Sequence, residues 1–377
     1  MLEPKTFLPL MDEFKPPKLL YRDEQLQKMM SLVYERGLPE NLWLEGVKGL
    51  GKTLTCRCFA DEVQARGNNR VFIMRCERSI KMSLENMCEA YRVHVPKKRL
   101  SPSSVARKIV EDNPNVDLLV FIIDEPEEVH PFNEVAHFTH SLYNALSDLR
   151  EKFGFRFSIC FASRILYINA VRLMEGRRDS RLGLRPVSFP PYNADQIVGI
   201  LRQLLSIMFD DVGICEEEAL GYLARHIERV GSDIREAKRA LKYAIERSED
   251  QITLAVMADA VEFIKDEWWR DQLANLPPYC AFLLYTAAEL AQPGVEGYEA
   301  SQSDVVDRCI QRLRALEVDG PGLRTIYYIL SKIAEKGFFK QMRSSGFGNP
   351  IRLVFDKGDV KHIIRVGRSI NWKERLT

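Results

Sequence analysis

The stretch that most constrains this chain is a short apolar run followed at once by a glycine-rich turn. Residues 42–53 read Leu-Trp-Leu-Glu-Gly-Val-Lys-Gly-Leu-Gly-Lys-Thr. The pattern Gly-x4-Gly-Lys-Thr between a strand and a helix predicts a P-loop, because its glycines let successive backbone N–H groups point into one concavity that holds a phosphate. An ordinary glycine-rich turn before a helix is the alternative, and a second motif further along the chain argues against it.

Each polar residue of this loop has an expected task. Gly46, Gly49 and Gly51 form the cradle, and the helix that begins near Lys52 adds the positive end of its dipole. Lys52 is expected to reach the β- and γ-phosphates, and Thr53 to supply a hydroxyl to Mg²⁺. The sequence therefore predicts a site for ATP or ADP with Mg²⁺.

The second motif lies at the end of the apolar run 116–123, which is long enough for a central parallel strand covered on both faces. Asp124 and Glu125 follow this run, at the strand end where ligands of open α/β sheets gather. Asp124 is predicted to hold Mg²⁺, and Glu125 to orient and deprotonate an attacking water. Alone, the pair could be loop acids. Its place about 70 residues after the glycine-rich loop favours the catalytic interpretation.

Further candidates follow in the next segments. An apolar strand over 155–162 ends at Ser163, which can contact a γ-phosphate or the water, although a serine there is more often a turn former. Arg177, Arg178 and Arg181 cluster before Phe-Pro-Pro-Tyr. One of them can act in trans on a neighbouring subunit's nucleotide, and ordinary surface arginines remain the equal alternative. From Asp195 the pattern is helical and predicts a small lid, in which Arg235 can swing toward the phosphates.

Composition limits the class of protein. The 377 residues are 46% hydrophobic and 28% charged, as in ordinary globular proteins, and no apolar run is long enough to span a membrane. The start of the chain lacks a secretory pattern, and the eight cysteines form no Cys-x-x-Cys pair. We therefore expect a cytoplasmic, nucleoid-associated protein with reduced thiols and no membrane partner.

The net charge of +1 hides a basic C-terminal segment. Residues 321–377 carry twelve Lys or Arg against four acids, a net +8. Three helix candidates, 280–290, 302–316 and 322–336, precede two short strands, 337–342 and 350–355, that are joined by a basic glycine-containing loop. This order predicts a winged helix-turn-helix, whose third helix enters the major groove of duplex DNA. The expected DNA contacts are Arg324, Tyr327 and Lys332 on that helix, with Arg343 and Arg352 beside the wing.

The order of these motifs, together with Phe189-Pro-Pro-Tyr-x-Ala-x-Gln-Ile, resembles the AAA+ replication initiators, in particular the archaeal proteins related to origin recognition complex subunits and the cell-division-cycle helicase loader. The resemblance covers roughly residues 15–365. It implies an α/β AAA+ P-loop domain with a parallel sheet over 1–190, a helical lid over 191–270 and a winged-helix DNA-binding domain over 271–377.

The same resemblance implies roles for single residues. Ser163 corresponds to sensor 1, Arg235 to sensor 2 and Arg181 to the arginine finger. Arg22 and Tyr192 are expected to contact the nucleotide. Lys97, Lys98 and Arg99 fall where such initiators carry an inserted helix that touches DNA.

The implied function is ATP-dependent binding of origin DNA and recruitment of a replicative helicase, with initiator paralogues as further partners. Three departures argue for slow ATP hydrolysis: Leu50 where the family usually has Thr, Ser163 where sensor 1 is usually Asn, and Arg75-Cys76 where Asn-Cys is common. The alternative function is an AAA+ regulator of transposition or signalling whose winged helix binds protein. A clamp-loader-type motor is disfavoured by the basic wing.

Overall fold

The computed structural model of this 377-residue chain describes residues 2–175, 182–210, 212–231, 233–294, 297–343, 351–356 and 358–377. Contacts divide the chain into two compact units, Met1–Ala258 and Asp259–Thr377. The first unit contains the predicted P-loop domain and most of the predicted lid. The boundary between the units falls inside one helix, α10 (Leu254–Asn275). The three-domain division predicted from the sequence remains a prediction.

A five-stranded sheet is the centre of the first unit, and its paired strands all run parallel. The strand order is β2-β3-β4-β1-β5. The bounds are β1 Leu42–Glu45, β2 Asn69–Arg75, β3 Leu118–Asp124, β4 Arg156–Ser163 and β5 Arg185–Ser188. Every residue of β3 is buried, which explains its uninterrupted apolar sequence. Because β4 lies between β1 and β3, the P-loop, Asp124 and the end of β4 meet at one edge of the sheet.

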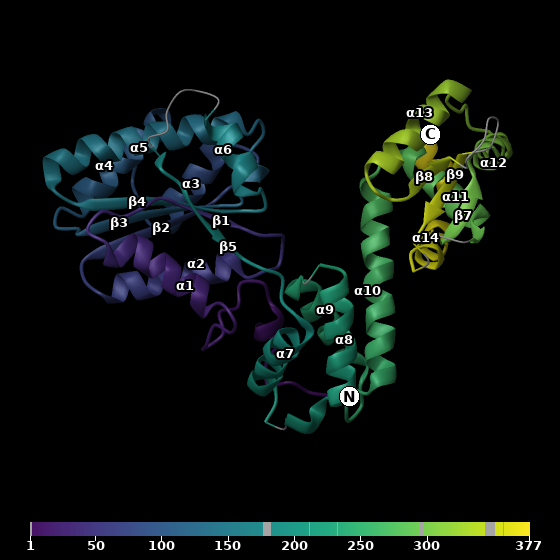
Figure 1. Ribbon diagram of the computed structural model, residues 1–377, viewed down its shortest axis with the longest axis horizontal. Helices are drawn as coiled ribbons and strands as arrows, with labels where there is room; N and C mark the ends of the chain where they lie inside the picture. The colour runs from purple at the N-terminus through teal and green to yellow at the C-terminus, as the bar shows by residue number, and fades with distance from the viewer. Residues whose placement is uncertain are drawn as a thin grey trace. The chain divides into compact units, whose positions relative to one another are not determined.

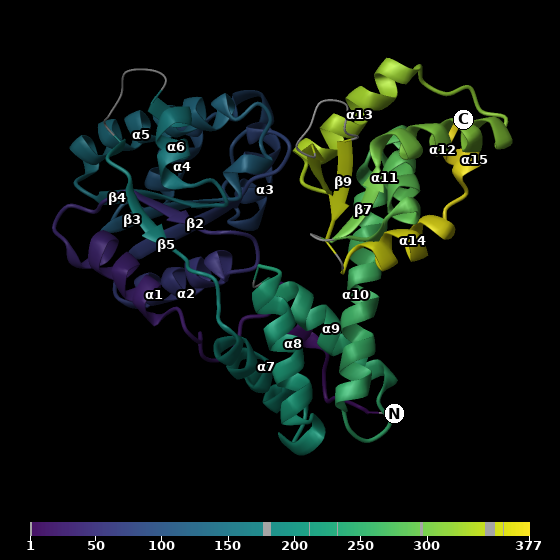
Figure 2. The ribbon, with the colours of Figure 1, turned by 45° about the vertical axis from the view of Figure 1, so that its right-hand side comes forward.

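Helices cover both faces of this sheet (Figures 1 and 2). On one face lie α1 (Asp23–Met29), which continues as a π-helical turn over Met30–Glu35, and α2 (Lys52–Ala65). The other face carries α3 (Ile80–Ala90), α4 (Pro102–Asp112), α5 (Asn133–Phe153) and α6 (Tyr167–Glu175). The apolar core of this second layer includes Trp43, Phe121 and Phe161 from the strands and Ile109 and Leu142 from α4 and α5. This is the predicted AAA+ architecture.

Three helices form the lid, as the periodicity after Asp195 predicted: α7 (Ala194–Met208), α8 (Glu217–Arg229) and α9 (Ile234–Arg247). A capping box closes the start of α7, in which Asn193 and Gln196 exchange hydrogen bonds. Asp233 caps α9 by accepting a hydrogen bond from the backbone N–H of Arg235. Both caps fix where the lid helices begin relative to the P-loop.

Residues 2–18, which we call the N-terminal strap, lie across the lid. The strap is fastened to the lid by four hydrogen bonds of 2.9 Å: Leu2 N to Ser248 O, Lys5 N to Met208 O, Lys238 Nζ to Met11 O and Gln203 Nε2 to Lys18 O. The strap is also attached to the helix that follows the P-loop, by a hydrogen bond of 3.2 Å from Arg57 of α2 to the Glu13 carbonyl and by an ion pair between Lys15 and Asp61.

The second unit has the helix order of a winged helix. Its helices are α11 (Pro278–Leu290), α12 (Gln302–Ala315) and α13 (Leu323–Glu335), followed by α14 (Val360–Arg368) and α15 (Trp372–Leu376). Strands β8 (Lys340–Arg343) and β9 (Ile351–Phe355) pair antiparallel as the expected wing. The sheet continues through β7 (Tyr298–Ser301) to β6 (Gln292–Pro293), which the sequence analysis did not predict. In the described parts of the chain, no helix is both long and apolar enough to cross a bilayer.

Candidate functional site

The glycine-rich loop between β1 and α2 has the backbone of a phosphate cradle. Gly49 and Gly51 have φ of +79° and +81°, a left-handed conformation that glycine adopts at little cost. Lys52 is buried, and its Nζ donates to the carbonyls of Gly46 at 2.6 Å and Val47 at 2.9 Å. Burial lowers the pKa of Lys52, an effect that the charges of Glu127 and Asp124 oppose. The ammonium group thus lies inside the loop, where its charge would attract a bound phosphate most strongly.

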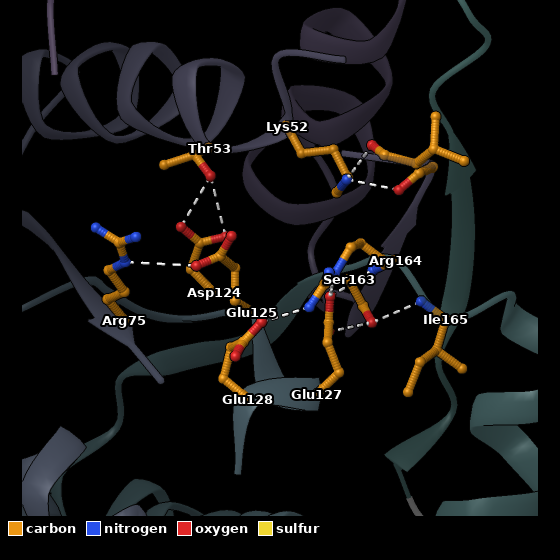
Figure 3. Close-up of polar contacts among 12 residues, drawn as sticks. Lys52, Thr53, Arg75, Asp124, Glu125, Glu127, Glu128, Ser163, Arg164 and Ile165 are labelled. Atoms are coloured by element: carbon orange, nitrogen blue, oxygen red, sulfur yellow. Dashed lines mark hydrogen bonds and ion pairs between the residues drawn. The ribbon is translucent and has the colours of Figure 1, made fainter. Parts of the chain in front are cut away.

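Thr53 and Asp124 meet beside this loop (Figure 3). The Thr53 Oγ1 lies 3.1 Å and 2.9 Å from the two carboxylate oxygens of Asp124, to which it donates. Asp124 is only 3% exposed, and this burial raises its pKa to about 6, against the opposing hydrogen bond from Thr53. A hydroxyl and a carboxylate are hard oxygen ligands of the kind that Mg²⁺ takes together with phosphate oxygens. The donor set therefore fits the predicted metal.

Glu125 follows with a left-handed backbone, φ 54° and ψ 51°, which is uncommon for a residue other than glycine. Its Oε2 lies 3.4 Å from the Nε of Arg75, at the end of β2. Arg75 is in register with Asp124 across the sheet, so its position beside the acidic pair is set by strand pairing. The carboxylate predicted to act as a base is thus paired with a cation.

Ser163 is not where its predicted role requires. It is fully buried and does not line the cavity, and its hydroxyl donates to Glu127 Oε2 at 2.7 Å. The next residue, Arg164, lines the cavity instead. Side chains alternate along a strand, so the residue after a buried strand end points to the opposite side. Arg164 and Glu127 were missed by sequence reasoning, although a charged residue directly after a buried strand was a usable signal.

On the lid side, Arg235 lines the same cavity. Its Nε and Nη2 donate to the carboxylate of Asp233 at 3.0 Å and 2.8 Å. Asp233 touches the P-loop closely, since a Cβ added at Gly49 would lie 2.0 Å from its Oδ1. Burial works against the charge of Arg235, but its pair with Asp233 outweighs this and raises the Arg235 pKa. Asp233 therefore lies between the lid arginine, Arg235, and the phosphate cradle, and it binds the guanidinium of Arg235.

Tyr192 lines the cavity, and its hydroxyl approaches Gly51 so closely that a Cβ there would lie 2.9 Å away. Arg22, predicted to contact the nucleotide, is 2% exposed and does not line the cavity. Its guanidinium donates to the carbonyls of Leu50 at 3.0 Å and Pro190 at 2.8 Å, and lies 3.7 Å from the Tyr192 ring centroid. Arg22 therefore holds the P-loop and the start of the lid together from behind the site.

The cavity has a volume of about 320 Å³. Its polar lining includes residues of the P-loop together with Asp124 and Glu125. Apolar side chains from the N-terminal strap, the residues that follow it and the lid also line it: Phe14, Pro16, Leu19, Leu20, Ile200, Leu204 and Ile234. A site of this size with a phosphate-binding loop and apolar side chains matches the size and chemistry of a nucleotide. The contribution of the strap was not predicted.

The arginine-finger candidate, Arg181, lies outside the described residues together with Arg177 and Arg178. The wing residue Arg343 ends β8, and its side chain also lies outside what the structure describes.

In the second unit, the third helix of the winged helix exposes the predicted residues. Arg324 and Lys332 are exposed on α13, and Tyr327 and Tyr328 are 43% and 61% exposed. The Lys332 Nζ lies 2.6 Å from Glu335 and 5.5 Å from the Tyr328 ring centroid. Tyrosines so exposed on a helix are not core residues.

The other candidate DNA residues differ in their surroundings. Arg352 on β9 forms an ion pair of 2.9 Å with Glu299 on β7, so the unpredicted strand supplies a counter-charge to the wing. Lys97, Lys98 and Arg99 form a short 3-10 helix before α4, and all three are exposed.

No family model matches this chain. Curated proteins with similar sequences do match it. The ORC1-type DNA replication protein 1 of Archaeoglobus fulgidus is 25% identical over 300 residues, which cover 75% of this chain and 71% of that protein. The ORC1-type DNA replication protein 1 of Methanosarcina acetivorans is 24% identical over 339 residues, 86% of this chain and 80% of the relative. These relatives confirm the predicted resemblance to archaeal initiators.

Solved structures show the same fold. The Aeropyrum pernix ORC1 protein in complex with DNA aligns with a TM-score of 0.63 at 21% identity, covering 97% of this chain and 99% of that one. The Aeropyrum pernix ORC2 protein, solved as ADPNP–ADP complexes, aligns with a TM-score of 0.62 at 16% identity over 98% of this chain and all of that one. The predicted fold class is thereby confirmed over nearly the whole length.

Proposed function

We propose that this relative of the ORC1-type DNA replication proteins is an ATP-dependent DNA-binding initiator, which recognises origin DNA and helps to recruit a replicative helicase. The observation that carries the proposal is the meeting of Lys52, Thr53 and Asp124 around a glycine cradle in the first unit. The exposed basic and aromatic face of α13 in the second unit supports the DNA-binding part. Contact with initiator paralogues belongs to the same proposal.

The chemistry of the first unit follows from its own residues. Backbone N–H groups of the P-loop and the Lys52 ammonium bind the phosphates. Thr53 and Asp124 would hold Mg²⁺, which would supply positive charge beside the phosphates. Glu125 takes the proton of the attacking water, and Arg235 approaches the phosphates from the lid.

Hydrolysis is proposed to be slow. Glu125 acts as a base only when its carboxylate is free to face the water, and here it is paired with Arg75. Ser163, the expected polar contact to the γ-phosphate, is buried and committed to Glu127. Both contacts have to change before the site is ready for catalysis. With slow hydrolysis, the bound nucleotide regulates the protein more than it supplies energy.

DNA recognition is assigned to α13 and the wing. Arg324, near the start of α13, is assigned to a base edge in the major groove or to the adjacent phosphate. Arg343 at the wing is assigned to the minor groove, where narrow AT-rich tracts concentrate negative potential. Lys97, Lys98 and Arg99 form a second basic surface, on the first unit, for phosphate contacts.

The test measures duplex binding by fluorescence anisotropy across a salt series, with the full chain and saturating Mg-ADP or a non-hydrolysable ATP analogue. Arg324→Ala is expected to reduce the difference in binding free energy between origin-derived and random duplexes by roughly 1–3 kcal/mol. Arg343→Ala is expected to weaken binding to all duplexes. Lys52→Ala is expected to remove any difference between the two nucleotides. Lys373→Ala, which breaks only the exposed pair with Glu317, is the matched charge control.

Unchanged duplex affinity in both arginine variants would show that the winged helix does not read DNA. A protein-binding regulator would then be the better description.

A further inference from the structure

The second unit buries a histidine between two of its helices. His362 lies on α14, which packs beside the part of α10 that belongs to this unit (Figures 1 and 2). Its side chain is fully buried, and its Nδ1 lies 2.6 Å from Oδ1 of Asp266 on α10. A carboxylate accepts hydrogen bonds at this distance, so we assign the proton to Nδ1.

The other ring nitrogen has no hydrogen-bond partner. Within the described parts of the chain, His362 Nε2 is the buried side-chain nitrogen left unpaired. A carboxylate oxygen of Glu262, one helical turn before Asp266 on α10, lies 3.7 Å from it. Without a hydrogen, Nε2 turns its lone pair toward this negative charge. With one, it becomes a donor that a small side-chain movement brings within hydrogen-bond distance of Glu262.

Two cations of α14 bind the same two acids. Lys361 Nζ donates to Oε2 of Glu262, and Arg365 Nη1 donates to Oδ2 of Asp266, both at 2.6 Å. Burial works against the charge of Glu262, but the hydrogen bond from Lys361 and the charge of His362 outweigh it and lower the Glu262 pKa. The pair of acids on α10 therefore meets three basic side chains of α14.

The other charged groups near the histidine come from three helices. Lys265 of α10 lies 3.6 Å from Glu262. Asp359, at the start of α14, is half-buried, and this burial raises its pKa. On α11, Glu289 forms an ion pair of 3.8 Å with Arg368 of α14. Among all these residue types, histidine is the one that ordinarily changes its charge between pH 5 and pH 8.

We propose that His362 is a proton-dependent clamp between α14 and α10. In its doubly protonated form it donates from Nδ1 to Asp266 and from Nε2 to Glu262, so that one cation is shared by two carboxylates of the neighbouring helix. When Nε2 loses its hydrogen, the bond to Glu262 is lost. The clamp is therefore stronger at low pH and weakens as the pH rises. The chain enters the second unit along α10, so this contact determines how firmly the winged helix holds that helix.

The test is amide hydrogen–deuterium exchange of the full chain at pH 6 and pH 8, measured by mass spectrometry in peptides of α14 and corrected for the intrinsic exchange rate. In the wild type, the protection of α14 is expected to be about tenfold higher at pH 6, the effect of one charge-assisted hydrogen bond. His362→Gln, whose amide does not titrate, and Glu262→Gln, which lacks the second negative charge, are each expected to change less than threefold. Lys361→Gln removes another cation from Glu262 but keeps the histidine, so it is the matched control and should retain the pH dependence.

The control separates the histidine from the general charge around Glu262. Equal protection at both pH values in the wild type would overturn the inference, and so would a tenfold change that persists in Glu262→Gln. A pH dependence lost equally in Lys361→Gln and Glu262→Gln would also overturn it, because the effect would then not belong to His362. If His362→Gln does not fold, Glu262→Gln still decides, since the Glu262 side chain is 29% exposed and glutamine keeps its shape.

Discussion

Asp124 makes the metal-dependent affinity of this site sensitive to pH. Burial raises the Asp124 pKa from its ordinary value of 3.8 to about 6. A carboxylate binds Mg²⁺ only when ionised, so protonation and metal binding compete. With a pKa of about 6, the ionised fraction falls from nearly all at pH 7.5 to about one tenth at pH 5. The Asp124 contribution to Mg-nucleotide binding is therefore expected to weaken about tenfold over that range.

The raised pKa of Asp124 also makes the folding stability depend on pH. Because the folded-state pKa of Asp124 lies above the ordinary value, the ionised carboxylate opposes folding above about pH 6, and this cost is relieved as the pH falls below that value. A rise from 3.8 to about 6 corresponds to roughly 3 kcal/mol at 1.36 kcal/mol per pH unit. Bound Mg²⁺ offsets that cost, which ties metal binding to the stability of the first unit.

The assay compares the wild type with Asp124→Asn, which has a similar shape and cannot ionise. The dissociation constant for Mg-ADP is measured by calorimetry at several values between pH 7.5 and pH 5. The phosphates of the nucleotide titrate equally in both experiments, so the ratio of the two constants isolates Asp124. The advantage of the wild type should shrink about tenfold toward pH 5. A ratio that stays constant over this range refutes the reasoning.

Two further predictions concern arginines beside the site. Arg75→Gln should raise the turnover of ATP about two- to fivefold, since it frees Glu125 from an exposed pair worth less than about 1 kcal/mol; a drop in kcat in a steady-state phosphate-release assay would contradict this. Arg22→Lys should lower the thermal stability of the chain by roughly 1–3 kcal/mol, because a lysine cannot bridge the two carbonyls that Arg22 binds. The equivalent change at exposed Arg202 is its control, and equal melting temperatures for the two variants would speak against the bridging role.

The parts of the site that were predictable are those encoded by contiguous residues. The P-loop and the Asp124–Glu125 pair each follow directly from a buried strand, so strand, loop and polar group can be recognised together. The lid helices were predictable for a similar reason, since their apolar spacing and caps are local. Strand β7 was not, because it is four residues with no alternating pattern, and it joins the wing through β9, more than 50 residues away.

Arg22 and Ser163 show what local patterns leave undetermined. Arg22 is a charged residue that the fold buries, and two of its three carbonyl partners are 28 and 168 residues away in the sequence. Ser163 and Arg164 are neighbours, and which of them faces the cavity depends on the phase of β4 at its last residue. Neither burial by distant partners nor strand phase can be inferred from residue type alone.

The N-terminal strap is held to the lid by several separate bonds. Its bonds at Ser248, Met208, Gln203 and Lys238 are spread along the lid. Each contributes the modest net free energy of one hydrogen bond, about 0.5–1.5 kcal/mol. The attachment of the strap is therefore distributed, so that the loss of any one of these bonds leaves the other three in place.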